Sequence, residues 1–286
     1  MVATGGDPLS ARILAGLPAG RRPSPRYDLE SCRRGSGSAA FCTRVHLKVK
    51  SLLRKGFDKA GYYIGKKPMP NTLAHHLKYL FYRLQIDTVL DVGAHIGEYA
   101  AFLRTLGFNG PIISFEPLRE SFEILSADRT RHDKAWKGLS MALGESNEVG
   151  TLNVMDGTDL SSFLEPIDSA RDRFPGLSKS GSAPVEVRRL DSILGELTSS
   201  KKIFLKMDTQ GFDLKVLQGS KNCLDQIRMI QTEVAAKPIY SGMPLMTEVI
   251  HYLQELGYDL TGLFPVSRET NNLSVVEFDL VAHRRG

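Results

Sequence analysis

Cysteine and tryptophan are scarce in this chain of 286 residues, which contains 3 cysteines and 1 tryptophan. Cys32, Cys42 and Cys223 form neither a Cys-x-x-Cys pair nor the spacing of a metal-binding motif. An odd number of scattered cysteines favours free thiols, so we expect neither disulfides nor structural zinc.

Long apolar runs are also absent. No segment approaches the roughly 18 consecutive apolar residues that a membrane-spanning helix requires, and the first residues lack the apolar region of a secretory signal. We therefore expect a cytoplasmic protein. Hydrophobic residues still make up 42% of the chain, which is enough for a sizeable core in one large domain or two small ones.

Acidic residues are few at the N-terminus, where residues 1–70 contain 4 of them against 14 lysines and arginines. Residues 1–40 are rich in Gly, Pro, Ser and Arg without periodicity, which predicts a disordered arm; a start-site extension and an organelle-targeting segment are the alternatives. The pattern of residues 41–86 predicts helices. The helix predicted over residues 45–60 is basic and amphipathic. It either packs on the core or contacts an anionic membrane surface or an acidic partner. Membrane contact would place the protein peripherally at the inner face.

A second helix is predicted over residues 71–85, with Asn71 as its N-cap, and the catalytic domain over residues 87–286. In that domain apolar segments of strand length alternate with helical patterns, which indicates an α/β fold with a mainly parallel sheet, helices on both faces and an antiparallel C-terminal hairpin. The residues between 155 and 183 are polar and irregular, as expected of a lid or substrate loop. The predicted strands are 88–92, 112–116, 136–141, 151–154, 185–187, 203–207, 229–234, 259–264 and 276–282. The predicted helices are 96–106, 118–128, 190–194, capped by Asp191, and 244–256.

The most informative segment is the turn that follows the first strand. Asp91 lies near the end of that strand, Gly93 and Gly97 lie in the turn, and Glu116 ends the next strand. Parallel strands joined by a helix place such a turn and such a carboxylate side by side at the carboxyl edge of the sheet, where open α/β folds bind nucleosides. The glycine spacing does not fit a dinucleotide fingerprint. It suits S-adenosylmethionine, whose ribose hydroxyls Glu116 would bind.

The alternative interpretation of these two acids is structural. Asp91 would then cap the helix that follows, and Glu116 would be a solvated strand end. The two acids together favour the cofactor interpretation more than either acid does alone.

The same segments resemble the FkbM-type family of S-adenosylmethionine-dependent methyltransferases, in consistent order over residues 75–283. The resemblance implies a seven-stranded class I methyltransferase fold and methylation of a hydroxyl on a sugar or a natural product. The motifs that carry it are Asp91-Val92-Gly93-Ala94-His95-Ile96-Gly97, Phe115-Glu116-Pro117, Ala142-Leu143-Gly144, Ser161-Ser162-Phe163, Val187-Arg188-Arg189-Leu190-Asp191, Leu205-Lys206-Met207-Asp208-Thr209-Gln210-Gly211, Val216-Leu217-Gln218-Gly219 and Tyr240-Ser241-Gly242.

The resemblance also implies where the cofactor binds. The residues that it places in the cofactor site are Asp91, Gly93, His95, Gly97, Glu116, Met141 and Ala142, the last two beside the adenine. Asp208 would face the transferred methyl group. The chain departs from the family at three positions, because the family often has Asn at His95 and Glu at both Gln210 and Asp213.

Asp208, Glu233 and His95 are the candidates for the base that takes the acceptor's proton. We rank Asp208 first because it ends a buried strand beside the cofactor turn. Its alternative role is a hydrogen bond to the next turn or to the cofactor amine, and the alternative for Glu233 is a buried ion pair with Lys206. Asp208 and Glu233 could share a divalent cation, but without a third ligand we expect no metal.

The sequence therefore predicts an O-methyltransferase that acts on a sugar, a glycolipid or a polyketide-like product. Ser161, Ser162 and Tyr240 are candidate acceptor contacts by loop position. RNA methylation is an alternative, because the arm is basic and phosphates attract basic segments, but the mildly acidic body argues against nucleic acid. A cofactor-binding scaffold without catalysis is a second alternative. The sequence does not indicate an oligomeric state.

Overall fold

The structure is a computed structural model that describes residues 72–286, apart from the side chains of residues 129–131. The predicted arm 1–40, the predicted basic helix 45–60 and the predicted cap Asn71 lie outside the described residues. No helix among residues 72–286 is long and apolar enough to cross a bilayer.

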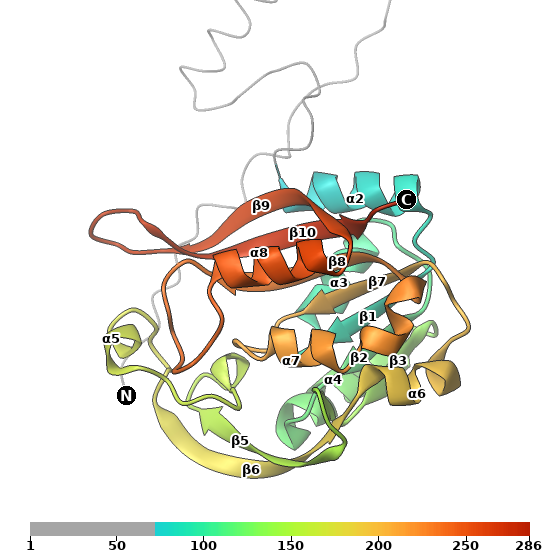
Figure 1. Cartoon of the computed structure of the whole chain (residues 1–286). Coiled ribbons are helices and arrows are strands. Elements are labelled where there is room, and N and C mark those ends of the chain that lie inside the picture. Colours follow the sequence, from blue (N-terminus) through green and yellow to red (C-terminus); the bar gives the residue numbers. More distant parts are fainter. Residues whose placement is uncertain (1–71) are drawn as a thin grey trace, which may run out of the picture. The chain divides into compact units, whose positions relative to one another are not determined.

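A seven-stranded sheet with the order β3-β2-β1-β7-β8-β10-β9 forms the centre of the fold (Figure 1). Strands β1, β2, β3, β7 and β8 run parallel, whereas β10 is antiparallel to β8 and to β9. This confirms the predicted α/β class and the C-terminal hairpin. The strands are β1 (Thr88–Val92), β2 (Ile112–Phe115), β3 (Trp136–Leu139), β7 (Ile203–Met207), β8 (Ile227–Ala235), β9 (Tyr258–Arg268) and β10 (Val275–Arg284).

Helices cover both faces of this sheet. On one face, α6, α7 and α8 pack with alternate strand residues in the larger core cluster. On the other face, α2 and α3 pack with the remaining strand residues in a second cluster. The helices are α2 (Leu73–Leu84), α3 (Glu98–Thr105), α4 (Arg119–His132), α5 (Asp168–Arg171), α6 (Leu190–Leu197), α7 (Asp213–Gln218) and α8 (Met246–Glu255), with the 3-10 turns η1 (Thr158–Leu160) and η2 (Lys221–Gln226).

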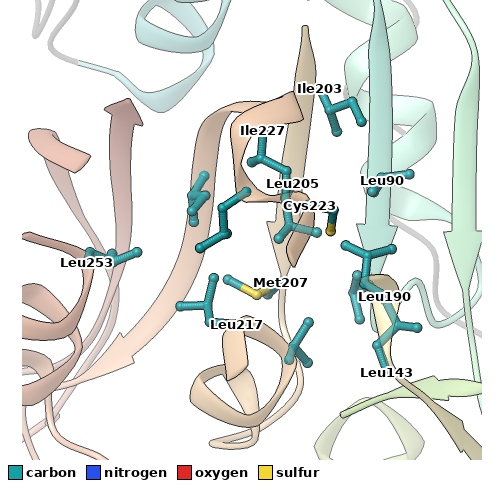
Figure 2. Close-up of a cluster of buried hydrophobic side chains, with 14 of the residues drawn as sticks. Leu90, Leu143, Leu190, Ile203, Leu205, Met207, Leu217, Cys223, Ile227 and Leu253 are labelled. Atoms are coloured by element: carbon teal, nitrogen blue, oxygen red, sulfur yellow. The ribbon is translucent and has the colours of Figure 1, made fainter. Parts of the chain in front are cut away.

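The central strands are buried on both faces. Every residue of β1 and β7 is buried, as expected for parallel strands between two helical layers. In Figure 2, Leu205 and Met207 of β7 lie between Leu217 of α7 and Leu90 of β1. The carboxyl ends of β1 and β7 are therefore held side by side, and Asp208 N donates to Val92 O at 3.1 Å.

A second sheet of three strands, in the order β4-β6-β5, lies beneath α7 in Figure 1. Its strands are β4 (Ala142–Leu143), β5 (Glu148–Met155) and β6 (Lys179–Arg188). The prediction of an irregular segment from 155 to 183 is wrong in part, because the segment contains η1 and α5 and because β6 already begins at Lys179. The first residues of β6 are exposed and small or polar, so they carry no apolar alternation by which a strand could be recognised.

Two predicted helix caps are also wrong. Thr72 is the N-cap of α2 and accepts from His75 N. Arg189 is the N-cap residue of α6, and the side chain of Asp191 forms an ion pair with Arg189 at 2.6 Å. The strand β1 matches its predicted range, and β2, β3, β8, β9 and β10 differ from theirs only at their ends.

Candidate functional site

The turn after β1 packs directly against the end of β7. Gly93 has φ +72°, and a Cβ atom at this position would lie 2.0 Å from Asp208 O. Only glycine satisfies both the backbone conformation and this close approach. The sequence therefore uses Gly93 to bring the first turn and Asp208 into contact.

Glu116 organises the other side of the same turn. Its Oε2 accepts from His95 N at 2.8 Å, and its Oε1 accepts from Leu118 N at 2.8 Å. His95 has φ +48°, so its amide points back toward the strand end. Each carboxylate oxygen keeps a further lone pair that can accept a hydroxyl hydrogen. Burial raises the pKa of Glu116 to about 7, although these two amide bonds oppose the shift.

A cavity extends from Glu116 to Asp208. Its wall near Glu116 is apolar and includes Ala142, Leu143, Phe163 and Phe212. The rings of Phe163 and Phe212 contact each other with centroids 4.6 Å apart. The cavity is narrow, about 60 Å³, so side chains of its wall must shift to admit a nucleoside, as interface rotamers commonly do on binding.

Lys206 lies buried beneath the turn. Its Nζ is 3.4 Å from Asp91 Oδ1, 3.6 Å from Asp208 Oδ2 and 3.2 Å from Gly93 O. Burial by itself lowers the pKa of this ammonium, but the carboxylates of Asp208 and Asp91 outweigh burial and raise the pKa above its ordinary value. Lys206 thus pairs with Asp91 and Asp208, and the predicted alternative pairing with Glu233 is not the one that forms.

Gln210 connects the two candidate carboxylates at the strand ends. Its Nε2 donates to Asp208 Oδ1 at 3.1 Å and lies 3.5 Å from Glu233 Oε2. The amide thereby orients Asp208. A glutamate at this position would have no hydrogen to donate and would add a like charge.

Glu233 is in a different electrostatic state from Asp208. Burial raises the pKa of Glu233 well above its usual range, and neighbouring carboxylates, Asp208 first, add to the shift. The pKa of Glu277 is raised too, chiefly by burial, and Glu277 is hydrogen-bonded to Glu233. A raised pKa favours the protonated form, so Glu233 is better suited to donate a hydrogen bond than to act as a base.

The remaining predicted site residues lie in different surroundings. His95 lines the cavity, and its Nε2 is 2.9 Å from Thr158 Oγ1. Ser161 also lines the cavity. Ser162 is fully buried and donates to Gln210 O at 2.7 Å, and Tyr240 is buried with its hydroxyl 2.6 Å from Leu160 O. These two side chains support the loops around the site, and neither lines the cavity.

Gly97 and Met141 do not line the cavity. Gly97 is the N-cap of α3 with φ +96°, and Met141 packs against the core cluster beneath the adjacent Ala142. Sequence reasoning missed Phe212, Thr158 and Asp159, which the structure adds to the lining. Phe212 could have been suspected, because it follows Gln210 and Gly211 in the turn that leaves β7. Thr158 and Asp159 lie in a polar segment without any pattern.

Asp208 and Glu233 are the pair that could share a divalent cation. Within residues 72–286, no three His, Cys, Asp or Glu side chains are grouped so that they could hold a metal ion. The positions of Asp208 and Glu233 are instead explained by Gln210 and Lys206.

The strand order and the turn after β1 define a class I methyltransferase fold with a cavity at the carboxyl edge of its sheet. The model of the methyltransferase FkbM domain matches residues 91–260, more than half of the chain. The chain belongs to the FkbM methyltransferase family. It is a methyltransferase, and S-adenosylmethionine is its methyl donor.

Three curated relatives are similar to this chain. Methyltransferase sdnD of Sordaria araneosa is 24% identical over 69% of this chain and 81% of its own length. The 2-O-methyltransferase NoeI of Sinorhizobium fredii is 22% identical over 70% and 84%. Hexuronic acid methyltransferase AglP of Haloferax volcanii is 25% identical over 52% of this chain, and the match spans 56% of that relative.

Two solved structures are similar to this chain at low sequence identity. Magnesium protoporphyrin IX methyltransferase from Synechocystis, solved with bound S-adenosylmethionine, is 9% identical with a TM-score of 0.40, over 82% of this chain and 97% of that chain. Fibrillarin from Aeropyrum pernix, also with S-adenosylmethionine, is 11% identical with a TM-score of 0.40, over 68% and 66%.

Proposed function

We propose that the protein transfers a methyl group to a hydroxyl of a sugar, a glycolipid or a polyketide-like product. One observation carries this proposal. The cavity beside Glu116 and an open hollow on the α3 side of the sheet share the lining residues Gly93, His95, Asp159 and Asp208. A methyl donor in the first space and an acceptor in the second would meet at Asp208. One relative is named a hexuronic acid methyltransferase and another a 2-O-methyltransferase, which supports the same acceptor class.

The residues of the narrow cavity fit the cofactor by their chemistry. Glu116 has free lone pairs for the two ribose hydroxyls, and the apolar wall with Ala142 and Phe163 suits the flat adenine. Gly93 leaves its backbone accessible next to Asp208. Asp91 reaches the site through Lys206, so its role is to fix the turn. Bound S-adenosylmethionine supplies an electrophilic methyl group on a sulfonium.

Asp208 is the proposed base. An alcohol is a weak nucleophile, and a base placed to take its proton contributes typically about 10² to 10⁴ fold in rate. Asp208 is partly exposed, with 38% of its side chain accessible, and its Oδ1 is held by Gln210. The Oδ2 atom lies 3.6 Å from the Lys206 ammonium. Positioning of the acceptor oxygen in line with the methyl group supplies the rest of the rate.

Glu233 and His95 have supporting parts in this proposal. Glu233, whose pKa is raised by burial, lines the hollow and hydrogen-bonds the acceptor there. His95 lies between Thr158 and Glu98, 3.5 Å from the latter, and lines both spaces. A cytoplasmic location, and contact of residues 45–60 with a membrane when the acceptor is lipid-linked, are part of the same proposal.

Transfer of label identifies the acceptor directly. The full chain is incubated with methyl-labelled S-adenosylmethionine and a fractionated extract, and the labelled product is analysed by mass spectrometry. We expect a hydroxyl-bearing small molecule or glycolipid whose mass rises by one CH₂ unit. Label in RNA would contradict the acceptor class. Cofactor binding without label in any fraction would favour a non-catalytic scaffold.

A further inference from the structure

The open hollow next to Asp208 is formed by one face of the sheet. Along β7, β8 and β10 the side chains on this face are apolar where α2 and α3 cover them, at Phe204, Met229 and Val281. Two residues further toward the site, the same face presents Lys206, Gln231 and Asp279. This face of the sheet is therefore polar where the helices no longer cover it, which suits contact with a polar molecule.

The size and the lining of the hollow suit a sugar ring. Its volume is about 450 Å³, within the range of small-molecule sites. The aromatic rings of Tyr99 and Phe102, with centroids 5.8 Å apart, form its apolar side. Opposite them, the buried amide of Gln231 donates to Asp279 Oδ1 at 2.8 Å and accepts from Tyr99 OH. An apolar ring face combined with several hydrogen-bonding groups matches a polyhydroxylated ring.

Carboxyl groups predominate among the ionisable side chains that line the hollow. Its lining includes five carboxyl side chains, from Glu98, Asp159, Asp208, Glu233 and Asp279. Among residues 72–286, Lys206 is the one lysine or arginine that lines it. The Lys206 ammonium already contacts Asp91, Asp208 and Gly93 O, and it lies 4.9 Å from the centre of the Tyr99 ring. The ring nitrogens of His95 face Glu98 and Thr158. Within the described part of the chain, residues 72–286, an acidic ligand would therefore find no free cation in this hollow.

We infer that this hollow is the acceptor site and that it takes a glycosyl ring without acidic groups, a neutral or amino sugar, and rejects uronic acids and sugar phosphates. The inference rests on the proposed methyl transfer. A carboxylate or phosphate placed among these carboxylates would lose its hydration without gaining a partner, and like charges at close range cost several kcal/mol. Hydroxyls and an ammonium instead donate hydrogen bonds to them.

Matched glycosides test the inference. Methyl glucoside, methyl glucosaminide and methyl glucuronide, with the corresponding galactose series, are titrated into the full chain saturated with S-adenosylhomocysteine, and their dissociation constants are measured by NMR. We expect the neutral or the amino sugar of at least one series to bind about tenfold or more tightly than its uronide. Asp159→Asn removes an exposed carboxylate of the hollow, and we expect it to reduce the ratio of these two dissociation constants at least twofold. Glu255→Gln, an exposed acid at the end of α8 and outside the hollow, leaves it unchanged.

Two results would overturn the inference. A uronide that binds as tightly as its neutral partner would show that the carboxylates do not select by charge. Binding of S-adenosylhomocysteine with no glycoside binding at all would reject the acceptor class while leaving the methyltransferase site in place. Failure to bind S-adenosylhomocysteine would instead count against the proposed cofactor site, and the inference would fall with it.

Discussion

Asp208 is the side chain on which the proposed chemistry depends. Replacing it by Asn keeps its size and its contact with Gln210 but removes the charge. We expect Asp208→Asn to hold S-adenosylhomocysteine within several fold of the original affinity and to lower methyl transfer by about 10² to 10⁴ fold. Glu148→Gln, an exposed residue of β5, serves as the control. Unchanged turnover in Asp208→Asn would remove this residue from the role of base.

Nucleoside binding is expected to depend on pH because the Glu116 carboxyl ionises near neutral pH. With its pKa raised to about 7 by burial, the carboxyl is half protonated near neutral pH, and the protonated form has lost part of its capacity to accept from ribose hydroxyls. Binding therefore strengthens as the pH rises through about 7 and then levels off, and on the acid side it changes by at most about tenfold per pH unit. The probe is 5′-methylthioadenosine, which does not ionise in this range.

The control for this dependence is Glu116→Gln, which cannot ionise. Its affinity for 5′-methylthioadenosine is expected to be lower at high pH and flat across the same range. If the original protein and the variant show the same profile, the pH dependence belongs to another group and Glu116 does not bind the ribose.

At the level of elements, the β1 turn and the end of β7 act as one unit. Gly93→Ala places a Cβ atom 2.0 Å from Asp208 O and strains φ +72°. Gly107→Ala, with φ +89° and no neighbouring atom within 4 Å, is matched for strain alone. We expect Gly107→Ala to reduce the free energy of unfolding by about 1–2 kcal/mol, and Gly93→Ala by more than about 4 kcal/mol. Urea unfolding measures both, and equal losses would contradict the close approach.

The elements that sequence analysis located correctly are those with strong patterns. The buried strands β1 and β7 are continuous apolar runs with one charged residue each, Asp91 and Lys206, and their order along the chain fixes the position of the turn and of Asp208. The strand β6 was underestimated because its exposed half has no apolar alternation. Phe212 and Asp159 join the site only through folding of distant segments, which local patterns do not encode.

At the scale of the whole molecule, α2 is an integral part of the core. Phe81 is 9% exposed, and its ring contacts Phe108 and Phe204 edge-on with centroids 5.4 and 5.2 Å away. Its neighbour Tyr82 is 85% exposed. Phe81→Ala is expected to cost about 3–5 kcal/mol of unfolding free energy, and Tyr82→Ala less than about 0.5 kcal/mol. Similar losses for both, measured by urea unfolding, would show that α2 does not dock as described.

The proposed site depends on contributions from the entire sheet edge. The turn after β1 and Glu116 frame the cofactor, whereas β7, β8 and β10 present the groups of the acceptor hollow. The family assignment identifies the donor but leaves the acceptor open, because fold alone does not determine substrate. The charges of the hollow are the feature of this chain that narrows the choice.

Titration calorimetry with S-adenosylhomocysteine tests the central claim most directly, because one nucleoside must lie between Glu116 and Asp208. We predict binding of one molecule per chain, weakened at least about tenfold in Glu116→Ala by the loss of two ribose hydrogen bonds to a charged group. Binding should be unchanged in Glu123→Gln, an exposed acid of α4. No binding to the folded protein, or equal affinity in Glu116→Ala, would contradict the account.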